Sequence, residues 1–171
     1  MRASGSLLLA VLAVACAASI STACVDETHD EEVAALGPEQ AGVPPGPDHR
    51  PGQPCITCHG GSGPAKTQFS VGGTVYEIEG QTMPAVGASV TIEDIDGHLW
   101  TVSTNSVGNF FVLLSDFAPH YPTQPTVTPA NGPAISMATH VSRDGSCADC
   151  HANPAGPTSA GPVYAQRAMT P

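Results

Sequence analysis

Apolar and polar side chains alternate along the chain between residues 68 and 115. In residues 88–93, Ala88, Val90 and Ile92 fall on one face and polar residues on the other, as in a strand with one buried side. Further strands are predicted at 69–75, 99–104, 109–114 and near 126–128, where β-branched and aromatic residues are dense. The pattern therefore predicts a mainly β fold, a small antiparallel β-sandwich over residues 68–130.

The first 45 residues lack this alternation. Arg2, the apolar run 7–20 and the small residues 21–23 are typical of a secretory signal peptide over residues 1–23. Residues 24–45 are acidic at first and then rich in Pro and Gly. We expect them to form a disordered tether, because such a segment buries too little apolar surface to fold alone.

Two copies of the pattern C-x-x-C-H carry the most specific chemical signal. They consist of Cys55, Cys58 and His59, and of Cys147, Cys150 and His151. This pattern is the attachment signal for c-type haem: both sulfurs bond to one porphyrin, and the histidine is the proximal iron ligand. A zinc site made from both cysteine pairs would have to close across residues 60–146, far more than in zinc ribbons. A dithiol redox motif is the remaining alternative. The sequence predicts two haem c groups.

Gly and Pro follow both motifs, at residues 60–64 and 154–157, and end any helix that begins there. This favours loop-wrapped haems over the helical fold of single-haem cytochromes. We therefore expect a first haem segment at residues 46–67, and a second haem segment and tail at residues 131–171.

The motifs leave the second axial ligand of each iron open. His49 and His140 precede the motifs at similar spacings, and we expect these two to be the distal ligands, with Met137 and His120 as alternatives. Methionine ligation raises the reduction potential of the iron and bis-histidine ligation lowers it. Side chains at both axial positions exclude small molecules from the iron, which predicts an electron carrier and not an enzyme.

The formal net charge of the sequence is −10. This charge disfavours nucleic acid as a partner and favours a redox protein with a basic docking patch, although solubility alone is an equal reason for it. Two cysteines lie outside the motifs. Lipidation of Cys24 would anchor the protein to a membrane; cleavage before Cys16 and simple secretion are the alternatives.

The segments 73–75, 84–90 and 104–111 resemble the carboxypeptidase regulatory-like (transthyretin-like) β-sandwich, over roughly residues 70–130. That domain is non-catalytic in its relatives. As a whole, the chain resembles small exported cytochromes whose haem motifs flank such a sandwich. The resemblance implies export from the bacterial cytoplasm, to the periplasm, the outer membrane or the medium.

The function that the sequence predicts is electron transfer by two covalently bound low-spin haems. One alternative is a small haem enzyme with one open iron, of the peroxidase or nitrogen-oxide reductase type. The other is a haem-bearing surface or filament module that assembles with copies of itself.

Overall fold

The computed structural model describes residues 26–39 and 41–168. The elements follow one another as α2 (Glu27–Ala35), α3 (Cys55–His59), β1 (Phe69–Ile78), β2 (Ser89–Glu93), β3 (Leu99–Ser103), β4 (Asn109–Leu113), β5 (Gln124–Thr128), β6 (Ile135–Ser136), α4 (Cys147–Cys150) and β7 (Val163–Gln166). The predicted mainly β fold is confirmed. The predicted signal peptide, Cys16 and Cys24 lie outside the described residues.

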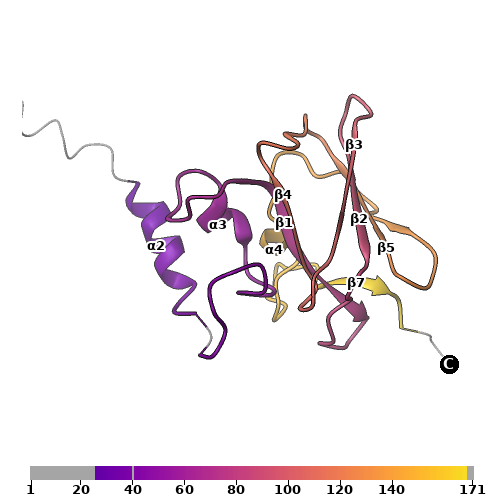
Figure 1. The fold of residues 1–171 in the computed structure, drawn as a ribbon, viewed down its shortest axis with the longest axis horizontal. Coiled ribbons are helices and arrows are strands. Elements are labelled where there is room, and N and C mark those ends of the chain that lie inside the picture. The colour runs from indigo at the N-terminus through magenta and orange to yellow at the C-terminus, as the bar shows by residue number, and fades with distance from the viewer. Residues whose placement is uncertain (1–25, 40, 169–171) are drawn as a thin grey trace, which may run out of the picture.

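The strands form two sheets that face each other, with the orders β4-β1-β7 and β3-β2-β5-β6 (Figure 1). β1 pairs antiparallel with β4, and β2 pairs antiparallel with β3 and β5. One pair departs from the expected antiparallel pattern: β7 runs parallel to β1, with Val163 opposite Val75. β7 lies in the tail, for which the sequence predicts a loop, because four residues show too little alternation to identify a strand.

The hydrophobic core lies between the sheets. Val75 and Val112 from the first sheet and Val90 and Ile92 from the second are fully buried. Each contributes about 1.5–3 kcal/mol relative to an exposed side chain. The sandwich is therefore a stable support for the loops at its edges.

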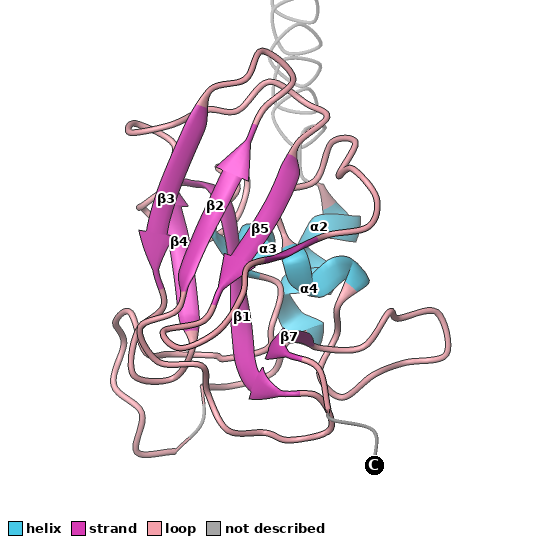
Figure 2. Ribbon diagram, turned by 90° about the vertical axis from the view of Figure 1, so that its right-hand side faces the viewer, coloured by secondary structure: helices cyan, strands magenta, loops and turns pink. Residues whose placement is uncertain are grey.

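Three helices in the described part of the chain accompany the sandwich. The short helices α3 and α4 each pack against β1, and α2 packs against α3 (Figure 2). The prediction that no long helix forms at the C-x-x-C-H motifs is confirmed, because α3 and α4 contain five and four residues. None of the helices in the described part of the chain is long and apolar enough to span a bilayer.

The prediction of a disordered tether is wrong for residues 27–35, because these residues form α2. Its first turn is capped by Asp26, whose carboxylate accepts a hydrogen bond from the N–H of His29 (3.2 Å). A helix of nine residues without a buried side chain is marginal by itself, so its contacts with the rest of the protein decide whether it forms.

Candidate functional site

The two C-x-x-C-H motifs lie against neighbouring residues of one strand. A Cβ atom added to Gly72 would lie 3.0 Å from Cβ of Cys55, and one added to Gly73 would lie 2.8 Å from Cβ of Cys147. Successive residues of a strand point to opposite faces. Cys55 and Cys147 therefore approach β1 from opposite faces, and motifs distant in the sequence are separated by little more than one strand.

The second motif reaches β1 through a short backbone pairing. The N–H of Gly72 donates to the carbonyl of Gly145 (2.8 Å), and Gly72 and Ser146 form an isolated parallel bridge. A Cβ at Gly145 would collide with the carbonyl oxygen of Ser70. Glycine at residue 145 thus permits the close approach that brings α4 to the edge of β1.

His59 and His151, the predicted proximal ligands, each hold one ring nitrogen on a backbone carbonyl. Nδ1 of His59 lies 2.7 Å from the oxygen of Thr67, and Nδ1 of His151 lies 2.8 Å from the oxygen of Gly161. A carbonyl only accepts, so Nδ1 carries the proton and the Nε2 lone pair is left for another partner. Metal-binding histidines are oriented in this way.

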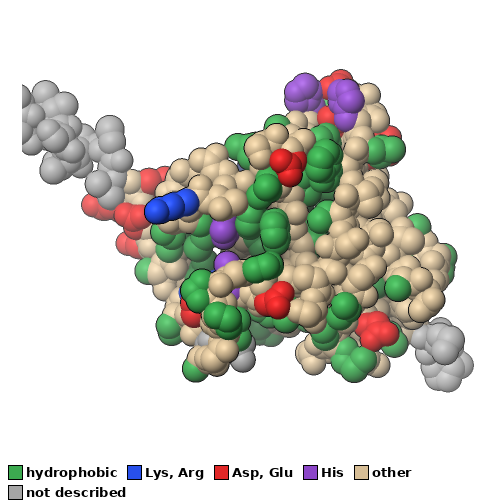
Figure 3. Space-filling model, in the orientation of Figure 1, with side chains coloured by type: hydrophobic (Ala, Val, Ile, Leu, Met, Phe, Trp, Pro, Cys, Tyr) green, Lys and Arg blue, Asp and Glu red, His purple; other side chains and the backbone are tan. Residues whose placement is uncertain are grey.

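The first motif borders a cavity of about 310 Å³, which is also lined by His49 and by aromatic side chains of β1 and β4. The ring of His59 stacks on Phe69, with centroids 4.0 Å apart, and Phe69 stacks on Phe111 at 4.6 Å. These stacked rings fix the orientation of His59. Figure 3 shows histidine side chains beside a hollow on this face of the molecule.

His49, a predicted distal ligand, lies opposite His59. The ring centroids are 5.9 Å apart and the planes differ by 16°. Two metal–imidazole bonds of about 2 Å each, together with half a ring on either side, span a distance of this order. The N–H of Gly46 donates to Nδ1 of His49 at 3.3 Å, so the neutral ring carries its proton on Nε2. A metal bound at Nε2 therefore takes the place of that proton.

Buried and partly buried hydrogen bonds join the loop of His49 to the sandwich. The side-chain amide of Asn109 donates to the carbonyls of His49 (2.9 Å) and Pro47 (3.2 Å). The hydroxyl of Thr74 donates to Asn109 (2.7 Å) and accepts from the N–H of Gly52 (2.7 Å). Strands β1 and β4 thus position the loop of His49.

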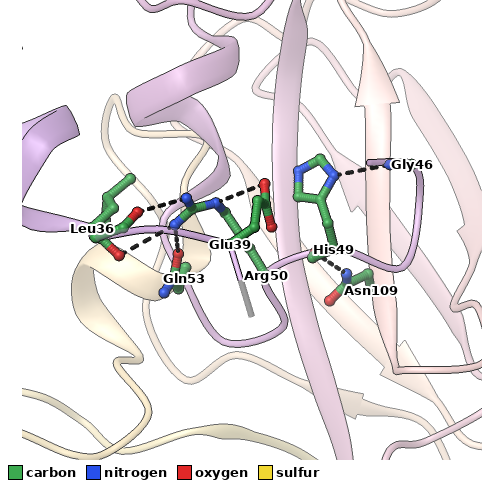
Figure 4. Close-up of polar contacts among 8 residues, drawn as sticks. Leu36, Glu39, Gly46, His49, Arg50, Gln53 and Asn109 are labelled. Atoms are coloured by element: carbon green, nitrogen blue, oxygen red, sulfur yellow. Dashed lines mark hydrogen bonds and ion pairs between the residues drawn. The ribbon is translucent and has the colours of Figure 1, made fainter. Parts of the chain in front are cut away.

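Arg50 joins this loop to the end of α2 (Figure 4). Its guanidinium donates to the carbonyls of Leu36 (3.2 Å) and Gly37 (2.7 Å) and forms an ion pair with Glu39 at 3.0 Å. Leu36 lines the first cavity. Leu36, which caps the C-terminal end of α2, is therefore part of the wall of this site, and the hydrogen bonds of Arg50 hold this end of the helix there.

The second motif borders a larger cavity, of about 380 Å³, whose lining includes Cys147, Cys150 and His151. Apolar side chains from both sheets complete the lining, among them Val71, Val90, Ile92, Phe110 and Val127. This cavity is an extension of the core of the sandwich. Met137 lines it, whereas His140 is exposed and outside the lining.

His120, the other alternative ligand, lies in a loop cluster away from both cavities. Its Nδ1 is 2.6 Å from a carboxylate oxygen of Asp96. Asp94 accepts hydrogen bonds from the N–H groups of Asp96 (3.0 Å) and His98 (2.9 Å). Asp94, Asp96 and His120 place ligand atoms within 4.8 Å of one another, but the hydrogen bonds within the cluster account for this geometry as a hairpin turn.

Desolvation raises the pKa of two motif thiols, that of Cys55 to about 11 and that of Cys147 to about 12. Reactive dithiols have lowered pKa values instead. Within residues 26–39 and 41–168, no group of three or more converging metal ligands contains a motif cysteine. Neither observation favours a dithiol redox site or a zinc site shared by both motifs.

Comparison of the chain with models of protein families, with curated proteins and with solved structures gives no match.

Proposed function

We propose that this chain is a dihaem c-type cytochrome that transfers electrons. The observation that carries the proposal is the matched arrangement of His59 and His151. Each donates Nδ1–H to a backbone carbonyl and leaves the Nε2 lone pair available beside a C-x-x-C pair. Each also borders its own cavity.

The residues of both cavities fit a haem. Volumes of about 310 and 380 Å³ lie at the lower end of the range of small-molecule sites, about 300–1,000 Å³, so each cavity would enclose part of a porphyrin, and the apolar and aromatic side chains in both linings suit that ring. Raised thiol pKa values are no obstacle to thioether formation, because attachment in the cell is assisted by a dedicated maturation system. The haem supplies a one-electron Fe(III)/Fe(II) couple.

The chain's own residues have distinct roles. Cys55 and Cys58 hold the first group and Cys147 and Cys150 the second, while His59 and His151 are the proximal ligands. β1 carries both motifs on opposite faces, at Gly72 and Gly73. One rigid strand thus keeps the two sites at a fixed, short separation, which suits electron exchange between them.

Export is part of the proposal, since haem c is attached outside the bacterial cytoplasmic membrane and residues 1–23 have the pattern of a signal peptide. Lipidation at Cys24 would tether the protein to a membrane. The net charge of −10 favours a redox partner with a basic docking patch.

The test is production in a host with a cytochrome c maturation system. We expect two haems per chain that survive denaturation and acid-acetone extraction, measured by mass spectrometry and by the pyridine haemochrome spectrum. In Cys58→Ala and in Cys150→Ala, the haem at the altered motif should be held by a single thioether or be lost, and the other haem should stay. Cys24→Ala should retain both haems. A colourless chain without added mass would refute the proposal. Strong binding of carbon monoxide by the reduced protein would favour the enzyme alternative.

A further inference from the structure

The two cavities differ in the side chain available for the distal position. In the first cavity this side chain is His49, whose ring centroid lies 5.9 Å from that of His59. The second cavity has no histidine besides His151 among its lining residues, but it has Met137. The sites are therefore chemically unlike, although their C-x-x-C-H motifs are alike.

Met137 is held in place by its backbone. Its N–H donates to the carbonyl of Pro125 (3.0 Å), and its carbonyl accepts from the side-chain amide of Gln124 (2.5 Å). Ile135, in β6, also lines the cavity. Ile135 and Met137 are half-buried, whereas Ser136 between them is exposed. Residues two apart in an extended segment share a face, so Ile135 and Met137 face the cavity that both line.

The same alternation excludes His140. Val141 pairs with Thr123 through two backbone hydrogen bonds, of 2.8 and 2.9 Å, and its side chain lines the second cavity. The preceding residue of an extended segment points the other way. His140 is indeed exposed, and turning it inward would require breaking the pairing with Thr123.

We propose, on the basis of the two-haem function above, that the irons have different axial ligands: His59 and His49 at the first site, and His151 and Met137 at the second. A thioether ligand raises the reduction potential and a second imidazole lowers it. His49 and Met137 thus bias a single electron towards the second site.

The proposal also gives the transfer a direction. If an electron enters at the first site, the group held by His49 and His59 would be oxidised as the group held by Met137 and His151 is reduced, so that one electron is exchanged. The first site borders α2 and the loop of His49, whereas the second extends into the core of the sandwich. We therefore expect the first site to receive electrons and the second to retain them.

The experiment is magnetic circular dichroism of the oxidised protein in the near infrared, with a redox titration followed by visible absorption. In the wild type, one of the two haems should show the methionine–Fe(III) charge-transfer band. The redox titration should show two separate reduction steps. Met137→Leu, which conserves side-chain volume, should lose the band and keep both covalent haems. Met137→His should lose the band and bring the two steps together.

His140→Ala is the matched control and should leave both the band and the titration unchanged. His29→Ala is the second control. Nε2 of His29 is buried without a hydrogen-bond partner and so resembles a ligand atom, but His29 lines neither cavity. A wild-type protein with two haems and no methionine band overturns this inference while leaving the proposed function intact. The inference is also overturned if the methionine band survives Met137→Leu. It is likewise overturned if His140→Ala or His29→Ala changes the band or the titration. Absence of covalent haem contradicts the proposed function itself.

Discussion

Single glycine residues set how closely the two motifs approach β1. Gly73→Ala would place a Cβ atom 2.8 Å from Cβ of Cys147, 3.0 Å from its Sγ and 3.1 Å from the ring of Phe110. Overpacking of this kind typically costs about 1–3 kcal/mol. We expect a lower free energy of unfolding and less haem at the second motif, measured by denaturant unfolding and by mass spectrometry of tryptic peptides.

Gly156→Ala is the control for this prediction. Gly156 also follows the second motif, but a Cβ atom there meets nothing within 4 Å. It should keep full haem content and nearly unchanged stability. Equal haem content in the Gly73 and Gly156 variants would show that α4 does not need its close contact with β1.

At the residue scale, the C-x-x-C-H motifs can be found in the sequence, whereas the choice of distal ligands stays a prediction. Cys55, Cys58 and His59 can be recognised in the sequence because they lie within one short helix, which fixes their spacing. His49 was chosen from its spacing to the motif, and the structure places it opposite His59. Spacing could not separate His140 from Met137, because the choice depends on the pairing of Val141 with Thr123, which is a long-range contact.

Among the structural elements, the loop that carries His49 depends on strand β4. Asn109→Ala removes two hydrogen bonds to this loop and leaves the hydroxyl of Thr74 without its acceptor. Loss of such buried partners costs about 1–3 kcal/mol. We expect the first site to lose part of its bis-histidine signal in electron paramagnetic resonance, while the second site keeps its own spectrum.

A neighbouring hydrogen bond supplies the control. Ser106 donates to Asp48 of the same loop at 2.9 Å, but this contact is exposed, so Ser106→Ala should change stability and spectrum little. If both variants weaken the first site equally, then general loosening of the loop, and not the buried bonds of Asn109, accounts for the effect.

The hairpin between β2 and β3 should respond to acid. Burial opposes ionisation of Asp94, but hydrogen bonds from His98 and His120 and the charge of His98 outweigh it and lower the pKa of Asp94 to about 2. A depressed carboxyl pKa contributes stability above the ordinary value of about 4, and this contribution is lost as the pH falls from there towards 2. Thermal unfolding should show this loss in the wild type and a smaller one in Asp94→Asn. Asp116→Asn, at an exposed turn, should behave as the wild type.

The opposite sign applies to His120. Its hydrogen bond with Asp96, followed by the charges of Asp96 and Asp94, raises its pKa above 6.5. Protonated His120 therefore stabilises the folded state below pH 6.5, and the contribution disappears as the pH rises through the raised pKa. In nuclear magnetic resonance, the His120 resonances should shift at a higher pH in the wild type than in Asp96→Asn. Identical titrations in the two proteins would contradict the assigned contact.

Elements with long, regular alternation could be predicted from the sequence, and elements that depend on distant partners could not. β2 alternates cleanly and lies where it was expected. α2 was missed because its sequence is polar on all sides, and its end is fixed by Arg50 from another segment. β7 was missed because only its pairing with the end of β1 makes it a strand.

For the whole molecule, the acidic charge should decide which redox partners react fast. Four acidic residues on α2 are exposed beside the wall of the first site: Glu27, Asp30, Glu31 and Glu32. A cationic reagent is attracted to such a surface, and salt screens the attraction, since the Debye length falls from about 10 Å at 0.1 M to about 3 Å at 1 M. We expect reduction by a cationic complex to slow as salt rises, and reduction by an anionic complex to accelerate.

Charge variants then locate the entry point of the electron. The double variant Glu27→Gln, Glu31→Gln should weaken the salt dependence for the cationic complex, because it removes charge next to the first site. The double variant Glu93→Gln, Asp116→Asn removes the same formal charge from the sandwich, and should have the smaller effect in stopped-flow measurements. Should the sandwich variant have the larger effect, electrons enter elsewhere than at the first site. The direction of transfer from His49 towards Met137 would then have to be reversed or abandoned, even if the axial ligands are as proposed.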